Sequence, residues 1–281
     1  MTPPLHIGRA GAILELALHR PERRNALSHE LLGKLTDVFA AAARDADVRC
    51  VVLTGAPPAF CAGLDLQELA GNPAQSYEPD ISAFRMLLDT IDRCPRPVVA
   101  AVNGPAAAGG AALVTVCDVV VMAASATIGY PGVRHGLVAP IVLPYLLRCV
   151  AERTARYLLL TGELVPAARA LELGLADEVA TDDAVLTRAR QYAGLLAGHP
   201  PAAVRDTKAA LLHGYSTTWH HGQAGEPRLG KSLALPRCRT AEADPAPPSG
   251  PQGERAAAAP WSADIHVSDE ARRGVQRFLD R

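Results

Sequence analysis

Residues 97–110 read Pro97-Val-Val-Ala-Ala-Val-Asn-Gly-Pro-Ala-Ala-Ala-Gly-Gly110, an apolar run that leads into small residues and glycines. Residues 98–102 carry no polar side chain on either face, which is typical of a strand buried on both sides of a parallel sheet. We expect a helix to begin near Gly109 and to point its free N–H groups outward. The segment therefore predicts a buried strand followed by a backbone site for an anion.

Strand-like and helix-like segments alternate on both sides of this stretch. Short apolar runs predict strands at residues 13–18, 50–53 and 118–122. Apolar residues at helical spacing predict two helices, which carry Leu31, Leu35, Val38 and Phe39, and then Phe84, Leu87, Leu88 and Ile91. Ser28 is a suitable cap for the first, and Pro166 and Gly174 bracket a third. This alternation predicts an α/β fold with crossover connections.

Length and composition indicate a globular protein with almost no net charge. The chain has 281 residues, 49% of them hydrophobic and 20% charged, and its formal charge is −1. This balance does not favour nucleic acid or an anionic membrane surface as a partner. The N-terminus lacks the pattern of a signal peptide, and no stretch approaches the roughly 20 apolar residues that span a bilayer. We therefore expect a cytoplasmic protein with no membrane segment.

The six cysteines are dispersed, with no C-x-x-C pair and no histidine at ligand spacing. This pattern argues against a disulfide framework and against a structural zinc site, so we expect no metal. The more suitable role is that of small buried hydrophobes. These residues are Cys50, Cys61, Cys94, Cys117, Cys149 and Cys238.

The composition divides the chain into a core, residues 1–198, and a C-terminal helical region, residues 199–281. Residues 237–263 are rich in Pro, Ala, Gly and charge, which predicts a flexible insertion that cannot bury enough surface to order itself. Order is expected to return after Ser268, in a last helix that carries Val275, Phe278 and Leu279.

A second glycine-containing segment, Phe60-Cys-Ala-Gly-Leu-Asp65, also follows a predicted strand. Glycine permits a close approach of backbone to ligand, and two such segments at neighbouring strand ends suit a developing oxyanion. Glycine turns after strands are common, so each segment by itself more often indicates a structural turn.

Taken together and in order, these segments and four others resemble the crotonase, or enoyl-CoA hydratase/isomerase, family. The resemblance covers residues 10–213 and, more briefly, 268–279. It implies a spiral of ββα turns with C-terminal helices that form a homotrimer or a dimer of trimers. It also implies an acyl-CoA thioester as substrate and no tightly bound cofactor, because coenzyme A enters as part of the substrate. The other segments are His19-Arg-Pro-Glu-Arg-Arg-Asn-Ala-Leu27, Val51-Val-Leu-Thr-Gly55, Cys117-Asp118 and Leu160-Thr-Gly162.

Carried over by position, the resemblance implies an oxyanion hole formed by the N–H groups of Leu64 and Gly109. Removing one donor from such a hole typically costs about 2.7–4 kcal/mol of barrier. The residues that it assigns to a groove for CoA are Arg20, Arg23, Arg24, Ala26, Ala62, Gly63 and Gly110. The three arginines either meet the CoA phosphates or form a solvated basic turn.

The sequence departs from the family at the two positions where its hydratases carry catalytic glutamates. Those positions are Ala112 and Gly132 here, and neither residue transfers a proton. Hydration of a conjugated double bond needs acid/base groups that are each worth about 10²–10⁴-fold in rate. An ordinary hydratase mechanism is therefore not expected, and Gly132 also counts against the simple isomerases.

Three alternatives remain for the chemistry. Decarboxylation of a malonyl-type thioester needs no base, because loss of CO₂ itself generates the enolate. The second alternative is an external base. Naphthoate synthases of the family resemble this chain in having glycine at the position of Gly132, and they use bicarbonate as the base. Their supporting glutamine is replaced by Tyr130 here. In the third, another side chain has taken over the proton transfer.

Candidates for such a side chain are Asp65 and His135. Histidine titrates near working pH, which makes His135 a suitable general base, although a loop histidine often packs or faces solvent instead. Asp65 is either a catalyst or the cap of a helix that begins at Leu66. Tyr130 and Tyr145 either donate a hydrogen bond to the acyl group or belong to the core.

These observations favour an enzyme that processes an acyl-CoA through a thioester enolate, with non-standard acid/base groups and with lyase or isomerase chemistry of the kind found in fatty acid metabolism. One alternative is a catalytically silent family member that binds a CoA ester or serves as a scaffold. Another is a carbon–carbon bond hydrolase or decarboxylase that uses the same hole.

Overall fold

The computed structural model describes residues 3–70, 78–138, 140–221, 273 and 276. All the strands expected from the sequence are present, and the prediction of an α/β fold is confirmed. The strands are β1 (Leu5–Ala10), β2 (Ile13–Leu18), β3 (Cys50–Gly55), β4 (Val98–Val102), β5 (Ala106–Ala107), β6 (Val119–Ala123), β7 (Thr127–Gly129), β8 (Leu164–Pro166) and β9 (Glu178–Ala180).

Six of these strands form one sheet in the order β1-β2-β3-β4-β6-β9, and the short strands β5, β7 and β8 form a second sheet. Only β1 pairs antiparallel in the large sheet, and the other neighbours are parallel. Val51 pairs with Val98, and Val99 pairs with Val119. Because β3 and β4 are parallel neighbours, their carboxyl ends lie together at one edge of the sheet.

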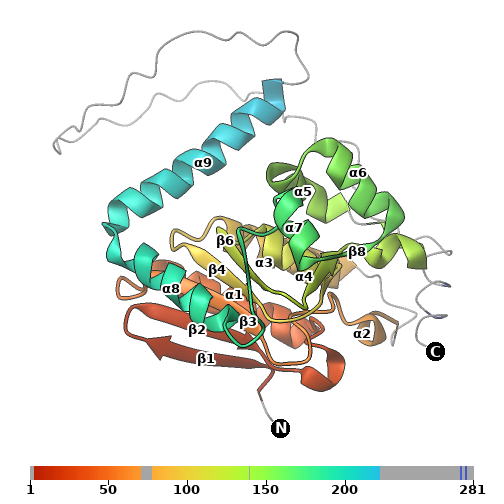
Figure 1. Cartoon of the computed structure of the whole chain (residues 1–281), viewed down its shortest axis with the longest axis horizontal. Coiled ribbons are helices and arrows are strands. Elements are labelled where there is room, and N and C mark those ends of the chain that lie inside the picture. The colour runs from red at the N-terminus through yellow and green to blue at the C-terminus, as the bar shows by residue number, and fades with distance from the viewer. Residues whose placement is uncertain (1–2, 71–77, 139, 222–272, 274–275, 277–281) are drawn as a thin grey trace.

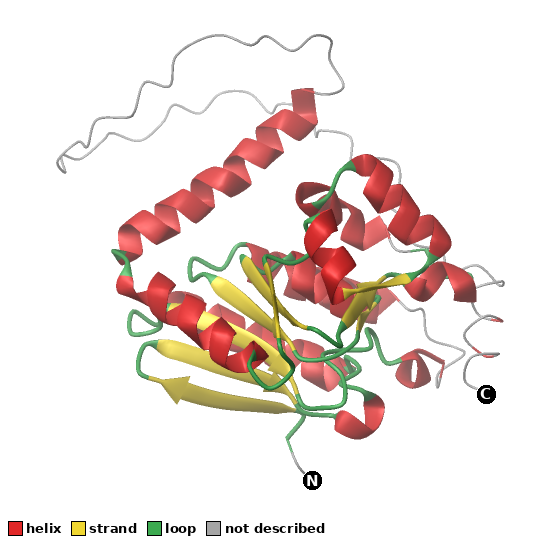
Figure 2. Ribbon diagram, in the orientation of Figure 1, coloured by secondary structure: helices red, strands yellow, loops and turns green. Residues whose placement is uncertain are grey.

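The helices cover both faces of the large sheet. In Figure 1, α8 crosses in front of the strands, while α1 and α3 lie behind them and pack against each other. Figure 2 shows the same layers by type of secondary structure. The α-helices are α1 (His29–Arg44), α2 (Leu66–Ala70), α3 (Glu78–Asp92), α4 (Gly109–Thr115), α5 (Leu143–Cys149), α6 (Glu152–Thr161), α7 (Ala167–Leu173), α8 (Val185–Gly198) and α9 (Pro201–His221), and the 3₁₀ helices are η1 (Pro21–Arg23), η2 (Pro131–His135) and η3 (Pro140–Val142).

The predicted helix ends are confirmed. Ser28 caps α1, because its hydroxyl oxygen accepts a hydrogen bond from Leu31 N at 3.2 Å. Gly174 ends α7 in a left-handed conformation with φ of 82°, as a glycine stop requires. Pro166 lies at the N-cap of α7 and is also the last residue of β8.

The five cysteines in the described part of the chain are free thiols. Cys50, Cys61 and Cys94 are buried, as expected of small hydrophobes, whereas Cys117 and Cys149 are partly exposed. Burial raises the pKa of the Cys50 and Cys61 thiols to about 12, which keeps both protonated.

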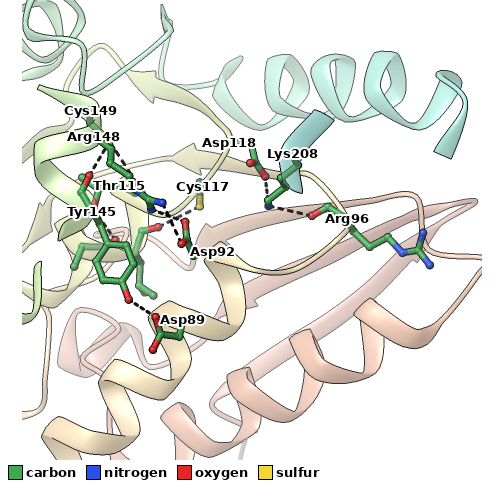
Figure 3. A network of polar contacts seen from close by, with 12 residues as sticks. Asp89, Asp92, Arg96, Thr115, Cys117, Asp118, Tyr145, Arg148, Cys149 and Lys208 are labelled. Atoms are coloured by element: carbon green, nitrogen blue, oxygen red, sulfur yellow. Dashed lines mark hydrogen bonds and ion pairs between the residues drawn. The ribbon is translucent and has the colours of Figure 1, made fainter. Parts of the chain in front are cut away.

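The C-terminal region begins with α9, and an ion pair connects this helix to the sheet. Lys208 Nζ lies 2.6 Å from Asp118 Oδ2, at the start of β6, as Figure 3 shows. The predicted insertion at 237–263 lies outside the described residues, and of the predicted last helix only Arg273 and Gln276 are described, both of them helical. None of the described helices is long and apolar enough to span a membrane.

Candidate active site

Two loops that follow β3 and β4 run side by side and form the centre of the candidate site. Cys61 of the first loop and Ala106 of the second form a parallel bridge. Ala107 N donates a hydrogen bond to Cys61 O at 2.9 Å. The two glycine-containing segments, separate in the sequence, are therefore joined by backbone pairing.

This pairing brings the N–H groups of Leu64 and Gly109 next to each other. A Cβ atom built on Gly109 would lie 3.4 Å from Leu64 N, and one built on Gly63 would lie 2.9 Å from Gly109 N. Neither N–H donates a hydrogen bond to another described residue. Because buried N–H groups are normally paired, two adjacent donors without a partner among the described residues are available to bind an acceptor atom of a ligand.

The backbone around these donors is held in an uncommon conformation. Ala108 has a φ of 51° and a ψ of −113°, which is strained for a residue with a Cβ and costs about 1–3 kcal/mol. Ala108 N donates to Gly129 O at 2.9 Å, a bond that anchors the strained residue to β7. A Cβ on Gly110 would lie 2.1 Å from Cys61 O, so α4 approaches the first loop closely only because Gly110 has no side chain.

Asn25 fastens a third segment, residues 20–27, to the first of these loops. Its side-chain amide nitrogen donates to Ala56 O at 2.8 Å and to Ala59 O at 2.7 Å, and its Oδ1 accepts from Arg20 N at 2.9 Å. The residue is fully buried, with a φ of 56°. Sequence reasoning assigned no role to Asn25, although asparagine is one of the few residues that tolerate this conformation.

Asp65 lies directly after the donor Leu64 and is buried between two arginines. Arg20 Nη2 lies 2.9 Å from Oδ2, and Arg23 Nη2 lies 3.1 Å from Oδ1. Oδ1 also accepts a hydrogen bond from Gln67 N at 3.1 Å, so Asp65 caps α2, one of the two roles considered for it. Burial raises the pKa of the Asp65 carboxyl, but the two guanidinium groups outweigh it and hold that pKa below its ordinary value.

The other residues assigned to a CoA groove lie around the same loops. Ala62 N donates to Arg24 O at 3.0 Å, and Ala26 O accepts from Arg20 Nη1 at 2.6 Å. Arg24 and Ala62 are exposed, whereas Ala26 is buried. The structure thus gives Arg20 internal partners and leaves Arg24 facing solvent.

The two positions where hydratases of the family carry glutamates lie in different elements, α4 and η2. Ala112 is fully buried in α4. Gly132 lies in η2, and its carbonyl oxygen accepts from Leu137 N at 3.0 Å. His135 ends η2 and is partly buried. The segment is connected to the paired donors through β7, whose Gly129 O holds Ala108 N.

The two tyrosines considered as donors to an acyl group are both buried. The Tyr145 hydroxyl donates to Asp89 Oδ1 at 2.7 Å, which joins α5 to α3 beside the Arg148–Asp92 ion pair (Figure 3). The Tyr130 hydroxyl has no hydrogen-bond partner among the described residues. Burial raises the pKa of both phenols, so they act as hydrogen-bond donors or packing groups and remain protonated.

Within residues 3–70, 78–138 and 140–221, no cluster of three or more His, Cys, Asp or Glu side chains is arranged to hold a metal ion. The groups that gather at the candidate site are therefore backbone N–H donors, arginines and one ion-paired carboxylate.

The two paired loops at the end of a mixed, mainly parallel sheet belong to a crotonase-like α/β fold. The chain belongs to the enoyl-CoA hydratase/isomerase family, whose sequence model matches residues 8–234.

Individual relatives agree with this assignment. A putative enoyl-CoA hydratase of Thermus thermophilus is 42% identical over 206 residues, which cover 72% of this chain and 81% of that protein. The 2,3-dehydroadipyl-CoA hydratase of Escherichia coli is 34% identical over 238 residues, or 82% of this chain and 90% of that protein. The crystal structure of an enoyl-CoA hydratase from Mycobacterium smegmatis superposes with a TM-score of 0.73 at 31% identity, over 79% of this chain and 93% of that one.

Proposed function

We propose that this protein is an acyl-CoA-processing enzyme that stabilises a thioester enolate between the N–H groups of Leu64 and Gly109. The observation that carries the proposal is the pair of adjacent unpaired donors beside the space left open by Gly63 and Gly109. An enolate concentrates negative charge on one oxygen, and fixed donors at that oxygen need no reorganisation during the reaction. Its relatives named as enoyl-CoA hydratases support the choice of a CoA ester.

The proposed chemistry is that of a lyase or isomerase with acid/base groups other than the glutamates that Ala112 and Gly132 replace. Of the two candidates for proton transfer, we favour His135. Asp65 is engaged by two arginines and a helix N-terminus, and its lowered pKa makes it a weak base. A malonyl-type thioester needs neither residue, because the breaking bond to the carboxylate carbon leaves its electron pair in the enolate as CO₂ departs.

The test is to incubate the pure protein with enoyl-, 3-hydroxyacyl- and malonyl-type CoA esters and to follow products by mass spectrometry. We expect turnover of one class and its loss in Gly109→Ala, since the new Cβ would lie beside both donors. Gly33→Ala is the matched control, because a Cβ at Gly33 of α1 meets nothing within 4 Å. Absence of turnover together with absence of CoA-ester binding by calorimetry would refute the proposal.

A second candidate is a silent member that binds a CoA ester without converting it. It is favoured by the complete burial of Ala112 and by the ion pairs that occupy Asp65. Calorimetry separates the two candidates, because the silent protein is expected to bind acyl-CoA and to leave every tested ester unchanged. A carbon–carbon bond hydrolase acting on a diketone is the remaining alternative, and product analysis with such a substrate tests it.

We further propose that the chain assembles as a homotrimer or a dimer of trimers. Large apolar side chains are exposed along α6, β8 and α7, among them Leu160 at 71%, Leu171 at 43% and Leu164 at 42%. Exposed apolar surface of this kind favours association. Light scattering coupled to gel filtration is expected to give three or six times the mass of one chain, and a monomer would contradict the proposal.

A further inference from the structure

Phe84 of α3 reaches the glycine loops next to one of the two paired donors. Its ring atom Cζ is 3.2 Å from the position that a Cβ on Gly109 would take. The same position is 3.4 Å from Leu64 N. The tip of the ring therefore borders the space beside Gly109 that Leu64 N also borders.

The ring is held in place by the helix that carries it. Phe84, Leu87, Leu88 and Ile91 form one buried face of α3, and Phe84 itself is only 4% exposed. Sequence analysis identified this face as core, and nothing in the apolar pattern distinguishes Phe84 from its neighbours. Only the fold shows that the first member of the face reaches the glycine loops, 25 residues away from Gly109 in sequence.

The chemistry of a phenyl ring suits this place. The aromatic quadrupole makes the ring face negative and the ring edge, with its C–H groups, positive. Cζ is the outermost carbon of that edge, and it is the Phe84 atom that borders the space. A buried ring also excludes water, and in a site without water each N–H donor interacts more strongly with a developing negative charge.

We propose that Phe84 completes the oxyanion site: its ring edge contacts the thioester oxygen held by Leu64 N and Gly109 N and shields that oxygen from water. The inference rests on the proposed function, because it takes the occupant of the space to be a thioester oxygen. It makes Phe84 a catalytic residue of this chain, in addition to the two backbone donors.

The test places 4-fluorophenylalanine at position 84. The substitution puts the negative end of a C–F bond where the positive C–H edge was, while the ring stays in the core. The primary readout is the infrared stretching frequency of the carbonyl of a bound acyl-CoA labelled with ¹³C at the thioester carbon. This frequency falls when donors polarise the carbonyl, and it is measurable whether or not the ester is turned over.

The expected result is a smaller fall in carbonyl frequency than in the unmodified protein and, with a substrate that turns over, a kcat lower by about two- to tenfold at unchanged KM. Phe84→Leu keeps an apolar group without an aromatic edge, and we expect the same direction of change. The control is 4-fluorophenylalanine at Phe39, a fully buried residue of α1, which is expected to leave the frequency unchanged. A raised KM at unchanged kcat would mean only steric interference and would overturn the inference.

Gly109→Ala separates this inference from the proposed function. If Gly109→Ala abolishes the shift in frequency and both Phe84 variants leave it intact, the oxyanion hole stands and Phe84 is merely a core residue. If no acyl-CoA binds, or if the bound carbonyl is not polarised in the unmodified protein, the proposed function fails and the inference with it.

Discussion

The side-chain amide of Asn25 shows how much of the candidate site depends on single polar groups. It bonds to carbonyl groups more than 30 residues away along the chain, at Ala56, Ala59 and Phe60. Its Oδ1 at the same time accepts from Arg20 N. One buried side chain thus holds the proposed CoA groove against the first glycine loop.

Asn25→Ala is expected to lower the free energy of unfolding by about 3 kcal/mol or more, because several buried carbonyl groups and one N–H lose their partner. Urea denaturation followed by circular dichroism measures the loss. Gln67→Ala is the matched control, since this exposed amide has no side-chain bond among those of the described residues, and it is expected to change stability by less than about 0.5 kcal/mol. A loss in Asn25→Ala no larger than in the control would contradict the role given to Asn25.

The pH dependence of stability tests the Asp65 ion pairs. The folded pKa of Asp65 lies below its ordinary value of 3.8, so the ionised carboxylate stabilises the fold fully at pH values well above 3.8. That contribution is lost as the pH falls through the lower folded pKa. Asp65→Asn is therefore expected to be less stable than the unmodified protein by about 3 kcal/mol at neutral pH, with the difference shrinking in acid.

Urea denaturation of both proteins from about pH 7 down to about pH 3 gives this difference directly. A difference that does not change with pH would show that the carboxylate charge is not what stabilises the loop. From the sequence, Asp65 is either a catalyst or a helix cap, and neither role includes the two ion pairs. The two arginines lie 45 and 42 residues before Asp65, and no local pattern predicts such a pairing.

At the scale of elements, the site depends on the close contact between α4 and the first glycine loop. Gly110→Ala would place a Cβ 2.1 Å from Cys61 O, so backbone has to move. We expect a loss of several kcal/mol in stability, or failure to fold. Gly194→Ala is the control in α8, where a Cβ meets nothing within 4 Å and alanine is expected to stabilise the helix by up to about 1 kcal/mol. Thermal unfolding compares the two, and a stable Gly110→Ala protein would contradict this packing.

The elements themselves were predictable where their patterns are strong. The apolar runs of β2, β3 and β4 and the helical spacing in α1 and α3 identified these elements from the sequence, because burial dictates their residues. The second sheet was not predicted, since β5, β7 and β8 have only two or three residues each and lack a measurable period. The contact of Phe84 with the glycine loops also follows from the tertiary structure alone.

At the scale of the whole molecule, the connection between α9 and the sheet depends on Lys208. Its ammonium group contacts Asp118, at the start of β6, and the carbonyl of Arg96, before β4. The Lys208 side chain is 10% exposed and that of Asp118 30%. The pair therefore lies where water screens it only in part, unlike an ion pair on the open surface.

Lys208→Met is expected to lower the free energy of unfolding by about 1.5–3 kcal/mol, the usual range for a hydrogen bond to a charged group. Lys34→Met is the matched control, because both side chains of the Lys34–Glu30 pair of α1 are exposed. Such a pair contributes about 0–1 kcal/mol to stability. Urea denaturation of both variants measures the difference. Equal effects would show that α9 is held to the sheet by other contacts.

The proposed function requires Leu64 N and Gly109 N together to bind the oxygen of a CoA thioester. A crystal structure with a non-reactive acyl-CoA analogue tests it most directly. We expect the carbonyl oxygen to lie about 2.7–3.1 Å from both nitrogen atoms, with the Phe84 ring edge against it. A carbonyl oxygen bound elsewhere, or a Gly109 N–H paired with another protein group, would contradict the claim.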